Sequence, residues 1–199
     1  KRLLYGIERT NSLCWDPHKF MGLPVICSTF LIHNSEHLRM VSTCNKNRSY
    51  LFHGKDTLFD LGKISLACGR RADSIKLWLT WLSIGSEGWE KRIDYCIELA
   101  EYLENLVIQH PQLELMSSRY FSNVCFRWKP KNVNDNNKIN QTNLDIRKKL
   151  VSNGNFIISS AEINNNVILR PVIAHPTIQK NTLDELLSEI EKIGKKIEY

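Results

Sequence analysis

The stretch 16–19 reads Asp-Pro-His-Lys, and it constrains how this chain can fold more than any other feature. Pro17 fixes its own φ and disfavours helical backbone at Asp16, so no helix is expected to run through the stretch. Apolar, strand-like runs flank it on both sides. Residues 25–32 are rich in β-branched side chains and nearly continuously apolar, which is typical of a strand buried on both faces. The sequence therefore predicts a tight turn between two strands, from which Lys19 leaves the backbone in a set direction.

Beyond this region the chain alternates helical and strand-like patterns. The expected elements, in chain order, are a helix over 70–84, a longer helix from about 86 that Pro111 ends, a strand at 122–128, a flexible Asn- and Lys-rich loop over 129–143, a helix over 142–153, strands at 155–162 and 167–174, and a final helix opened by a capping box of Thr182 and Glu185. The second half thus predicts an α+β arrangement, in which helices cover a small antiparallel sheet.

The chemistry of Lys19 depends on its surroundings. A free lysine amine titrates near ~10.4 and is a poor nucleophile at neutral pH unless its environment lowers that value. Burial beside a cofactor can do so, and a Schiff base to lysine is the way in which pyridoxal phosphate is attached to enzymes. By itself the stretch is also compatible with a solvated surface lysine on a turn.

Several further motifs occur in a fixed order along the chain. They are Gly-Ile-Glu-Arg-Thr-Asn-Ser at 6–12, the turn at 16–19, Tyr-Leu-Phe at 50–52, Cys-Gly-Arg-Arg at 68–71 with Asp73 and Lys-Leu-Trp-Leu at 76–79, Asn-Val-Cys-Phe at 123–126, and Leu-Arg at 169–170. In this order they resemble the pyridoxal-phosphate-dependent group II amino-acid decarboxylases. Within that family the chain is most similar to the glutamate and cysteine-sulfinate decarboxylase branch.

The resemblance implies an α/β fold of the pyridoxal-phosphate-dependent transferase type, fold type I, which aspartate aminotransferase shares. Residues 1–85 would be the C-terminal part of the large, cofactor-binding domain, and residues 86–199 the small α+β domain. The chain begins without methionine, a few residues before the turn, so we expect the C-terminal portion of a longer, homodimeric enzyme. The acid that pairs with the pyridine nitrogen and the group that stacks on the ring would lie upstream, which predicts that this portion alone is inactive.

The resemblance also assigns roles within the turn. Lys19 matches the Schiff-base lysine, which would be both a cofactor-binding and a catalytic residue. His18 matches a cofactor-binding position near the phosphate, where an imidazole can donate a charge-assisted hydrogen bond; a turn histidine bonded to the backbone is the alternative. Asp16 could form the turn or contact the cofactor, and a carboxylate facing a phosphate would repel it unless it is otherwise bonded.

Two further residues match functional positions of the family. Tyr50 matches a tyrosine on a mobile catalytic loop, where a phenol can protonate the substrate's Cα after decarboxylation while loop closure excludes water. Arg170 matches the substrate-binding arginine, whose guanidinium can take a carboxylate through two parallel hydrogen bonds. Pro171 removes a ladder donor directly after it, so we expect an edge or bulged strand there. A surface aromatic and an arginine reaching to solvent are the respective alternatives.

Composition narrows the partners and the compartment. The formal charge of +6 comes from Lys and Arg residues scattered among acidic ones, so we expect no nucleic-acid partner. Six widely spaced cysteines form no Cys-x-x-Cys pair and no zinc-ligand spacing, so we expect no metal and a reducing, cytoplasmic location. The longest apolar stretch, 21–32, is too short to span a bilayer.

The function that follows is pyridoxal-phosphate-dependent decarboxylation of an acidic amino acid: glutamate, aspartate or cysteine sulfinate. Two alternatives remain open at this point. One is another enzyme of the same fold, such as a cysteine desulfurase, which also carries a His-Lys turn but needs a reactive cysteine on a mobile loop; Cys44 is the candidate for it. The other is an inactive, truncated copy that acts only in dimerisation.

Overall fold

The structure is a computed structural model of the 199-residue chain, and it describes residues 4–42, 62, 65 and 69–197. The chain divides into two compact units, which we call unit 1 (Lys1–Ser83) and unit 2 (Ile84–Tyr199). Each unit is described by itself below. The assignment of residues 1–85 and 86–199 to a large and a small domain stays a prediction.

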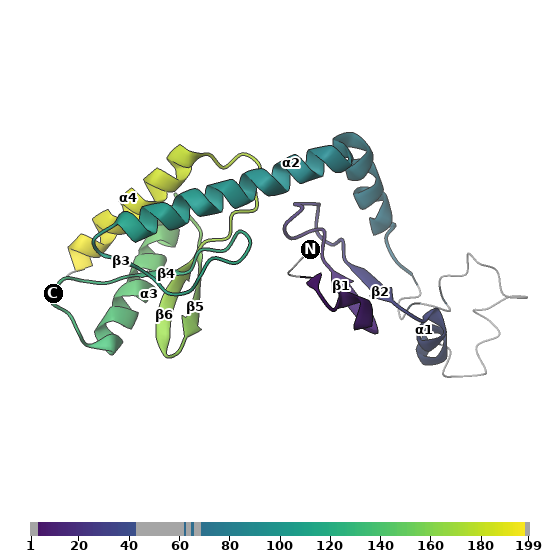
Figure 1. Ribbon diagram of the computed structural model, residues 1–199, viewed down its shortest axis with the longest axis horizontal. Helices are drawn as coiled ribbons and strands as arrows, with labels where there is room; N and C mark the ends of the chain where they lie inside the picture. Colours follow the sequence, from purple (N-terminus) through teal and green to yellow (C-terminus); the bar gives the residue numbers. More distant parts are fainter. Residues whose placement is uncertain (1–3, 43–61, 63–64, 66–68, 198–199) are drawn as a thin grey trace, which may run out of the picture. The chain divides into compact units, whose positions relative to one another are not determined.

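Unit 1 contains a two-stranded antiparallel sheet. Strand β1 (Ser12–Trp15) pairs with β2 (Thr29–Ile32), so that Trp15 lies opposite Thr29 at the end where the chain turns. A short 3-10 helix (Ile7–Arg9) precedes β1, and helix α1 (Ser35–Ser42) follows β2 (Figure 1). The predicted turn between two strands is thereby confirmed, with the long connection 16–28 joining them.

The prediction that 25–32 is a strand buried on both faces is wrong for the described structure. Only the second half of this run is a strand, and Phe30 and Leu31 in it are more than half exposed. Val25 and Ile26 lie in the irregular connection and are exposed as well. The reason is that β1 is the only strand paired with β2 among the described residues, and no second layer of those residues covers its faces.

Helix α2 (Asp73–Gln109) joins the two predicted helices into one long element. Its backbone is interrupted at Gly85, whose φ of 71° and ψ of 167° are not helical. A positive φ of this kind costs glycine little, because glycine has no Cβ to clash with the neighbouring carbonyl. The sequence therefore places the end of one helix and the start of the next within one or two residues of the observed break.

The sheet of unit 2 is antiparallel throughout and has the strand order β3-β4-β6-β5. Its strands are β3 (Leu113–Leu115), β4 (Phe126–Trp128), β5 (Ser159–Ile163) and β6 (Asn166–Arg170). The strand regions expected at 122–128, 155–162 and 167–174 are confirmed in shorter form. Strand β3 had not been predicted, since three residues are too few to show a period.

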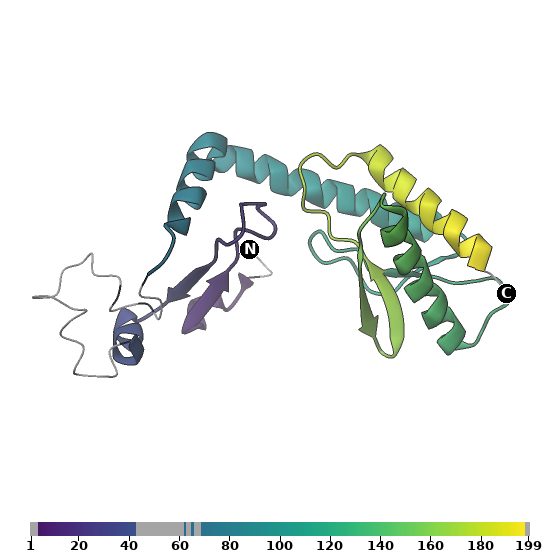
Figure 2. The same ribbon diagram turned by 180° about the vertical axis from the view of Figure 1, so that it is seen from behind.

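Helix α3 (Asn136–Asn153) packs on β4, β5 and β6 and against α4 (Lys180–Ile197) (Figures 1 and 2). The expected loop over 129–143 is wrong in its second half, because α3 begins six residues earlier than predicted. The carboxylate of Asp135 caps its N-terminus by accepting a hydrogen bond from the Asn137 backbone N–H. The predicted capping box of α4 is also wrong: Thr182 lies inside the helix, and its hydroxyl accepts from the Gln179 N–H at 3.4 Å.

The core of unit 2 is formed by apolar side chains from all three helices and the sheet. Phe126 and Trp128 of β4 and Leu103 of α2 have no exposed surface, and neither do Ile146 and Ile190 of α3 and α4. Helix α2 is joined to α4 by a hydrogen bond from the Tyr102 hydroxyl to Asp184. The predicted α+β arrangement is thus confirmed, with a continuous core between sheet and helices.

Candidate functional site

The turn that carries Lys19 is closed by its own backbone. The Lys19 N–H donates to the carbonyl of Asp16 at 3.0 Å, and the Leu23 N–H donates to the carbonyl of Pro17 at 3.3 Å. Pro17 and Leu23 are buried beneath the turn, whereas Lys19 is exposed. Pro17 and these two backbone hydrogen bonds therefore fix the conformation of the turn, and the Lys19 side chain extends from it into solvent.

His18 is fixed by the far end of the same connection. Its Nδ1 lies 2.8 Å from the carbonyl oxygen of Cys27, and its backbone N–H donates to that carbonyl at 3.3 Å. The Cys27 N–H also lies 3.3 Å from Nδ1, so both backbone groups of Cys27 contact this nitrogen. The structure thus shows the turn histidine bonded to backbone, with its second ring nitrogen outside that interaction.

Lys19 forms an ion pair with Asp16 in the described structure. Its Nζ lies 2.7 Å from Oδ2 of Asp16, while the Ser28 hydroxyl donates to Oδ1 at 2.6 Å. The hydrogen bond from Lys19, and after it that from Ser28, lowers the pKa of Asp16. The same hydrogen bond raises the pKa of Lys19, whose side chain is 71% exposed. In the described structure Lys19 is therefore exposed and its pKa is raised. A lysine that acts as a nucleophile at neutral pH needs a lowered pKa instead.

The first turn of α2 contacts the C-terminal end of the 16–28 connection, at Ile26 and Cys27. Lys76 pairs with Asp73 at 2.7 Å and donates to the backbone carbonyl of Ile26 at 3.0 Å. The thiol of Cys27 donates to the Asp73 carbonyl at 3.6 Å. The sequence singled out Lys76 as part of a motif but gave it no role. Its contacts show that it anchors the segment whose next residue, Cys27, orients His18.

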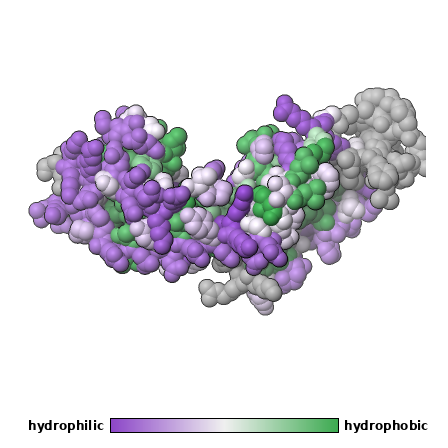
Figure 3. Space-filling model, turned by 90° about the horizontal axis from the view of Figure 1, so that it is seen from above, coloured by the Kyte–Doolittle hydropathy of each residue, from purple (hydrophilic) through white to green (hydrophobic). Residues whose placement is uncertain are grey.

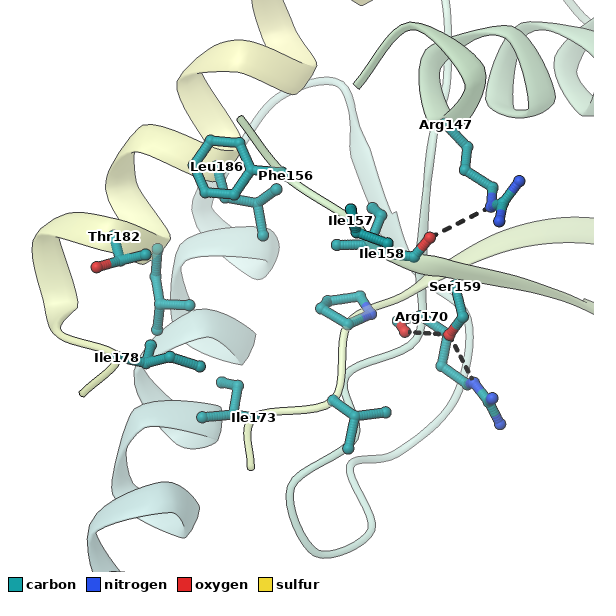
Figure 4. Close-up of a pocket in the computed structure, with 13 residues that line it drawn as sticks. Arg147, Phe156, Ile157, Ile158, Ser159, Arg170, Ile173, Ile178, Thr182 and Leu186 are labelled. Carbon is teal, nitrogen blue, oxygen red and sulfur yellow. Dashed lines mark hydrogen bonds between the residues drawn. The ribbon is translucent and has the colours of Figure 1, made fainter. Parts of the chain in front are cut away.

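Arg170 lies in unit 2, at the end of β6, and lines a cavity of about 430 Å³ (Figure 4). Its Nε donates to the Ser159 hydroxyl at 3.3 Å, and that hydroxyl donates to the Arg170 carbonyl at 2.7 Å. Arg147 lines the same cavity and donates to the Ile158 carbonyl. Figure 4 shows both arginines on the Ser159 side of the cavity. No ion pair joins Arg170 to a carboxylate within the described ranges, so its guanidinium is available to an anion.

The expectation of an edge strand at Arg170 is wrong. Strand β6 lies between β4 and β5 and is an interior strand. Its regular pairing ends at Arg170, and after Pro171 a single bridge joins Val172 to Asn123. The register is the same on both sides of Pro171, since Phe126 pairs with Leu169 and Asn123 with Val172, so the strand is not bulged there either.

The four predicted site residues are distributed as follows. His18 and Lys19 share the turn in unit 1, Arg170 lines the cavity in unit 2, and Tyr50 lies outside the described residues. The partnership of Asp16 with Lys19 was missed, although a signal for it exists: residues i and i+3 of a turn lie close together. Within the described ranges, no helix is long and apolar enough to cross a membrane, and no group of three or more metal-ligating side chains is found.

Comparison with known families gives a match over residues 1–129, to the family described as "Pyridoxal-dependent decarboxylase conserved domain". Among curated proteins, cysteine sulfinic acid decarboxylase of Mus musculus is 31% identical over 98% of this chain and 41% of its own length. Acidic amino acid decarboxylase GADL1 of the same species is 28% identical, over 98% of this chain and 37% of its own length. The chain thus spans about two fifths of the length of these relatives.

Solved structures agree with these sequence matches. The crystal structure of mouse CSAD in apo form superposes with a TM-score of 0.86 and 30% identity, covering 97% of this chain and 41% of that one. Tryptophan decarboxylase of Catharanthus roseus, solved in complex with L-tryptophan, gives a TM-score of 0.80 and 25% identity over 98% of this chain and 40% of its own. The fold predicted from the sequence, that of the pyridoxal-phosphate-dependent decarboxylases of fold type I, is confirmed.

Proposed function

Because this chain belongs to the pyridoxal-dependent decarboxylase family, we propose that the protein removes the α-carboxylate of an amino acid, with pyridoxal phosphate attached to Lys19 as a Schiff base. The observation that carries the proposal is the exposed amine of Lys19 on a turn that Pro17 and the backbone hold in place, inside the segment that matches the family. As a carboxy-lyase, the protein would release carbon dioxide and an amine.

The residues of the turn fit this cofactor. An aldehyde needs an accessible primary amine, and Nζ of Lys19 is accessible. When bound, pyridoxal phosphate supplies an electron sink for the electrons that the departing carboxylate leaves behind. His18 would bind the phosphate through Nε2. Nδ1 is engaged with the backbone of Cys27, which leaves Nε2 as the ring nitrogen that can reach a phosphate.

Arg170 and Tyr50 would act on the substrate. Arg170 would bind a substrate carboxylate in the two-hydrogen-bond geometry of a guanidinium, and thereby fix the orientation of the bond that breaks. The support is its position at the cavity without a carboxylate partner among the described residues. Tyr50 would donate the proton that Cα of the substrate needs after carbon dioxide leaves. Its support is the sequence motif at 50–52.

The substrate proposed is an acidic amino acid: glutamate, aspartate or cysteine sulfinate. Two relatives carry cysteine sulfinate or acidic amino acids in their names and match nearly the whole of this chain. The family match also favours decarboxylation over the desulfurase alternative. We further propose that the protein is a cytoplasmic homodimer, which sedimentation of the purified protein and imaging of a tagged copy would test.

The attachment site is tested by borohydride reduction of the protein loaded with pyridoxal phosphate, followed by peptide mass spectrometry. We expect the pyridoxyl label on the Lys19 peptide, its complete loss in Lys19→Ala, and its retention in Lys91→Ala, a control at an exposed position of α2. A label that persists on another peptide in Lys19→Ala would overturn the assignment. No label in any form would favour the non-enzymatic alternative.

The substrate roles are tested on protein that is loaded with pyridoxal phosphate and left unreduced, because borohydride reduction blocks turnover; a separately reduced portion of each variant checks the label. Arg170→Ala should retain the pyridoxyl label but weaken substrate use, since the guanidinium contacts substrate rather than cofactor. Tyr50→Phe should retain the label and lose amine product, because the phenyl ring has no proton to donate. A normal amine yield from Tyr50→Phe would exclude the proton-donor role.

A further inference from the structure

We infer that Asp16 is a positioning residue for Lys19: one carboxylate oxygen holds the ammonium of Lys19 whenever the lysine is not attached to the cofactor, and Ser28 holds the other oxygen. The inference rests on the proposed function of Lys19. It adds a defined resting place for the lysine side chain before the cofactor binds and after a substrate amine has displaced it.

The geometry of the turn brings the two charges together. The backbone bond from Lys19 to Asp16 places them at the two ends of a single turn, and their side chains meet at 2.7 Å. The carboxylate of Asp16 is 24% exposed, so it is partly shielded where Lys19 is open to solvent. A shielded carboxylate with a fixed orientation is a better anchor for a flexible lysine than a freely rotating one, because less side-chain freedom is lost on pairing.

Ser28 supplies that fixed orientation. It lies twelve residues from Asp16 in sequence, next to Thr29, and the pairing of Thr29 with Trp15 brings it opposite Asp16. Its hydroxyl donates to Oδ1 at 2.6 Å, which leaves Oδ2 for Lys19. The carboxylate therefore cross-links the two ends of the 16–28 connection and presents its remaining oxygen to the lysine.

The other titratable groups around the pair do not replace it. His18 follows in the chain but is bonded to Cys27, and its effect on the pKa of Asp16 ranks below those of Lys19 and Ser28. The thiol of Cys14 on β1 acts on Lys19 only weakly, as the last of its contributions. Within the described ranges, Asp16 is the residue that does most to raise the pKa of Lys19.

The consequence concerns how readily the amine reacts. An ammonium must lose one proton before its nitrogen can add to an aldehyde and expel one water. By favouring the ammonium, Asp16 slows attachment of the cofactor and stabilises the detached lysine. Removing the negative charge should therefore increase the fraction of reactive amine at a given pH.

The test is competitive acylation of the full chain, without cofactor, by a trace of acetic anhydride between pH 7 and 10, with peptide mass spectrometry and Lys91 as internal reference. In Asp16→Asn we expect Lys19 to be acylated between about 1.5 and 5 times faster than in the parent protein at the same pH, the range that exposed ion pairs allow. Ser28→Ala should give a smaller rise, because the carboxylate remains but is no longer oriented. Glu36→Gln, which removes an exposed ion pair with Arg39, should leave the Lys19 rate unchanged.

Equal acylation of Lys19 in the parent protein and in Asp16→Asn would overturn the inference, and so would a loss of thermal stability without a change in rate. This readout needs no cofactor, so it is independent of the proposed function. A parallel incubation with pyridoxal phosphate and borohydride separates the two: absence of a pyridoxyl label on Lys19 in every variant would defeat the proposed function, while the acylation rates would still decide the role of Asp16.

Discussion

Unit 2 removes the apolar side chains of a four-stranded sheet and its helices from solvent, whereas unit 1 leaves most of its own exposed. Pro17, Leu23 and Cys27 are the buried residues of unit 1 within the described ranges, and all of them lie in the connection that carries the candidate lysine. In unit 2, buried apolar residues run from Trp89 on α2 to Ile193 on α4. The two regions therefore differ in what stabilises them: a core in one, a local network of hydrogen bonds in the other.

The first part of α2, which also belongs to unit 1, has exposed apolar side chains as well. Trp78, Leu79 and Leu82 are more than half exposed there, and hydrophobic residues reach the surface in the space-filling view (Figure 3). A helix with a broad apolar stripe normally buries it against another element. The unit that carries Lys19 therefore has apolar side chains that its own described residues do not bury, whereas unit 2 forms a core of its own.

Replacing one leucine by alanine in each unit tests this difference in burial most directly. Leu169→Ala on β6 should destabilise the chain by between about 2 and 5 kcal/mol, because Leu169 has no exposed surface and its removal leaves a cavity. Leu31→Ala on β2 should cost less than about 1 kcal/mol, since Leu31 is 54% exposed. Urea unfolding of the full chain measures both, and equal losses would mean that β2 is as buried in solution as β6.

A polar residue tests whether the core of unit 2 depends on hydrogen bonds as well as on packing. The fully buried Asn143 side chain accepts from the Trp128 N–H at 2.8 Å and donates to the carbonyls of Trp128 and Ile139. Asn143→Ala should cost about 2–3 kcal/mol, because the backbone groups of Trp128 lose their partner in a dry environment. Asn137→Ala, at the exposed start of α3, serves as the control and should change the unfolding midpoint little.

The smallest expected effect is a dependence on pH at the surface of unit 2. Hydrogen bonding to Lys195 lowers the pKa of Glu191, and His110 contributes further. The folded state therefore binds a proton at the Glu191 carboxylate less tightly than the unfolded state does. The stability that Glu191 contributes is present above its unfolded pKa, near ~4.5, and is lost as pH falls through its folded pKa.

Glu191→Gln should therefore lower the melting temperature slightly at pH 7, with a difference that shrinks as pH falls toward 3. Melting curves of both proteins across this range measure it, with Glu98→Gln on the exposed face of α2 as control. A difference that stays constant with pH would mean that the carboxylate charge of Glu191 is not its source.

Sequence reasoning located the candidate lysine and histidine because their constraint is local. Pro17 acts on its immediate neighbours, so the turn follows from four residues. The contact of Ser28 with Asp16 could not be predicted in the same way, since it depends on the register in which β2 pairs with β1. The early start of α3 was missed for a related reason: asparagine is a weak helix former, and here Asn140 and Asn143 bond to strands that local propensity does not describe.

By itself the sequence determined the turn at 16–19, the helical faces of α2 and α4, the antiparallel strands of unit 2 and the resemblance to the decarboxylases. All of these depend on residue types and spacings within short windows of the chain. Only the tertiary structure decided that Lys19 is paired with Asp16, that His18 is fixed by Cys27, that Arg170 ends an interior strand, and that Phe30 and Leu31 of β2 are exposed. The physical reason is that charge state and burial depend on which groups come within a few ångströms of each other, and strand pairing and helix packing bring those groups together from distant positions.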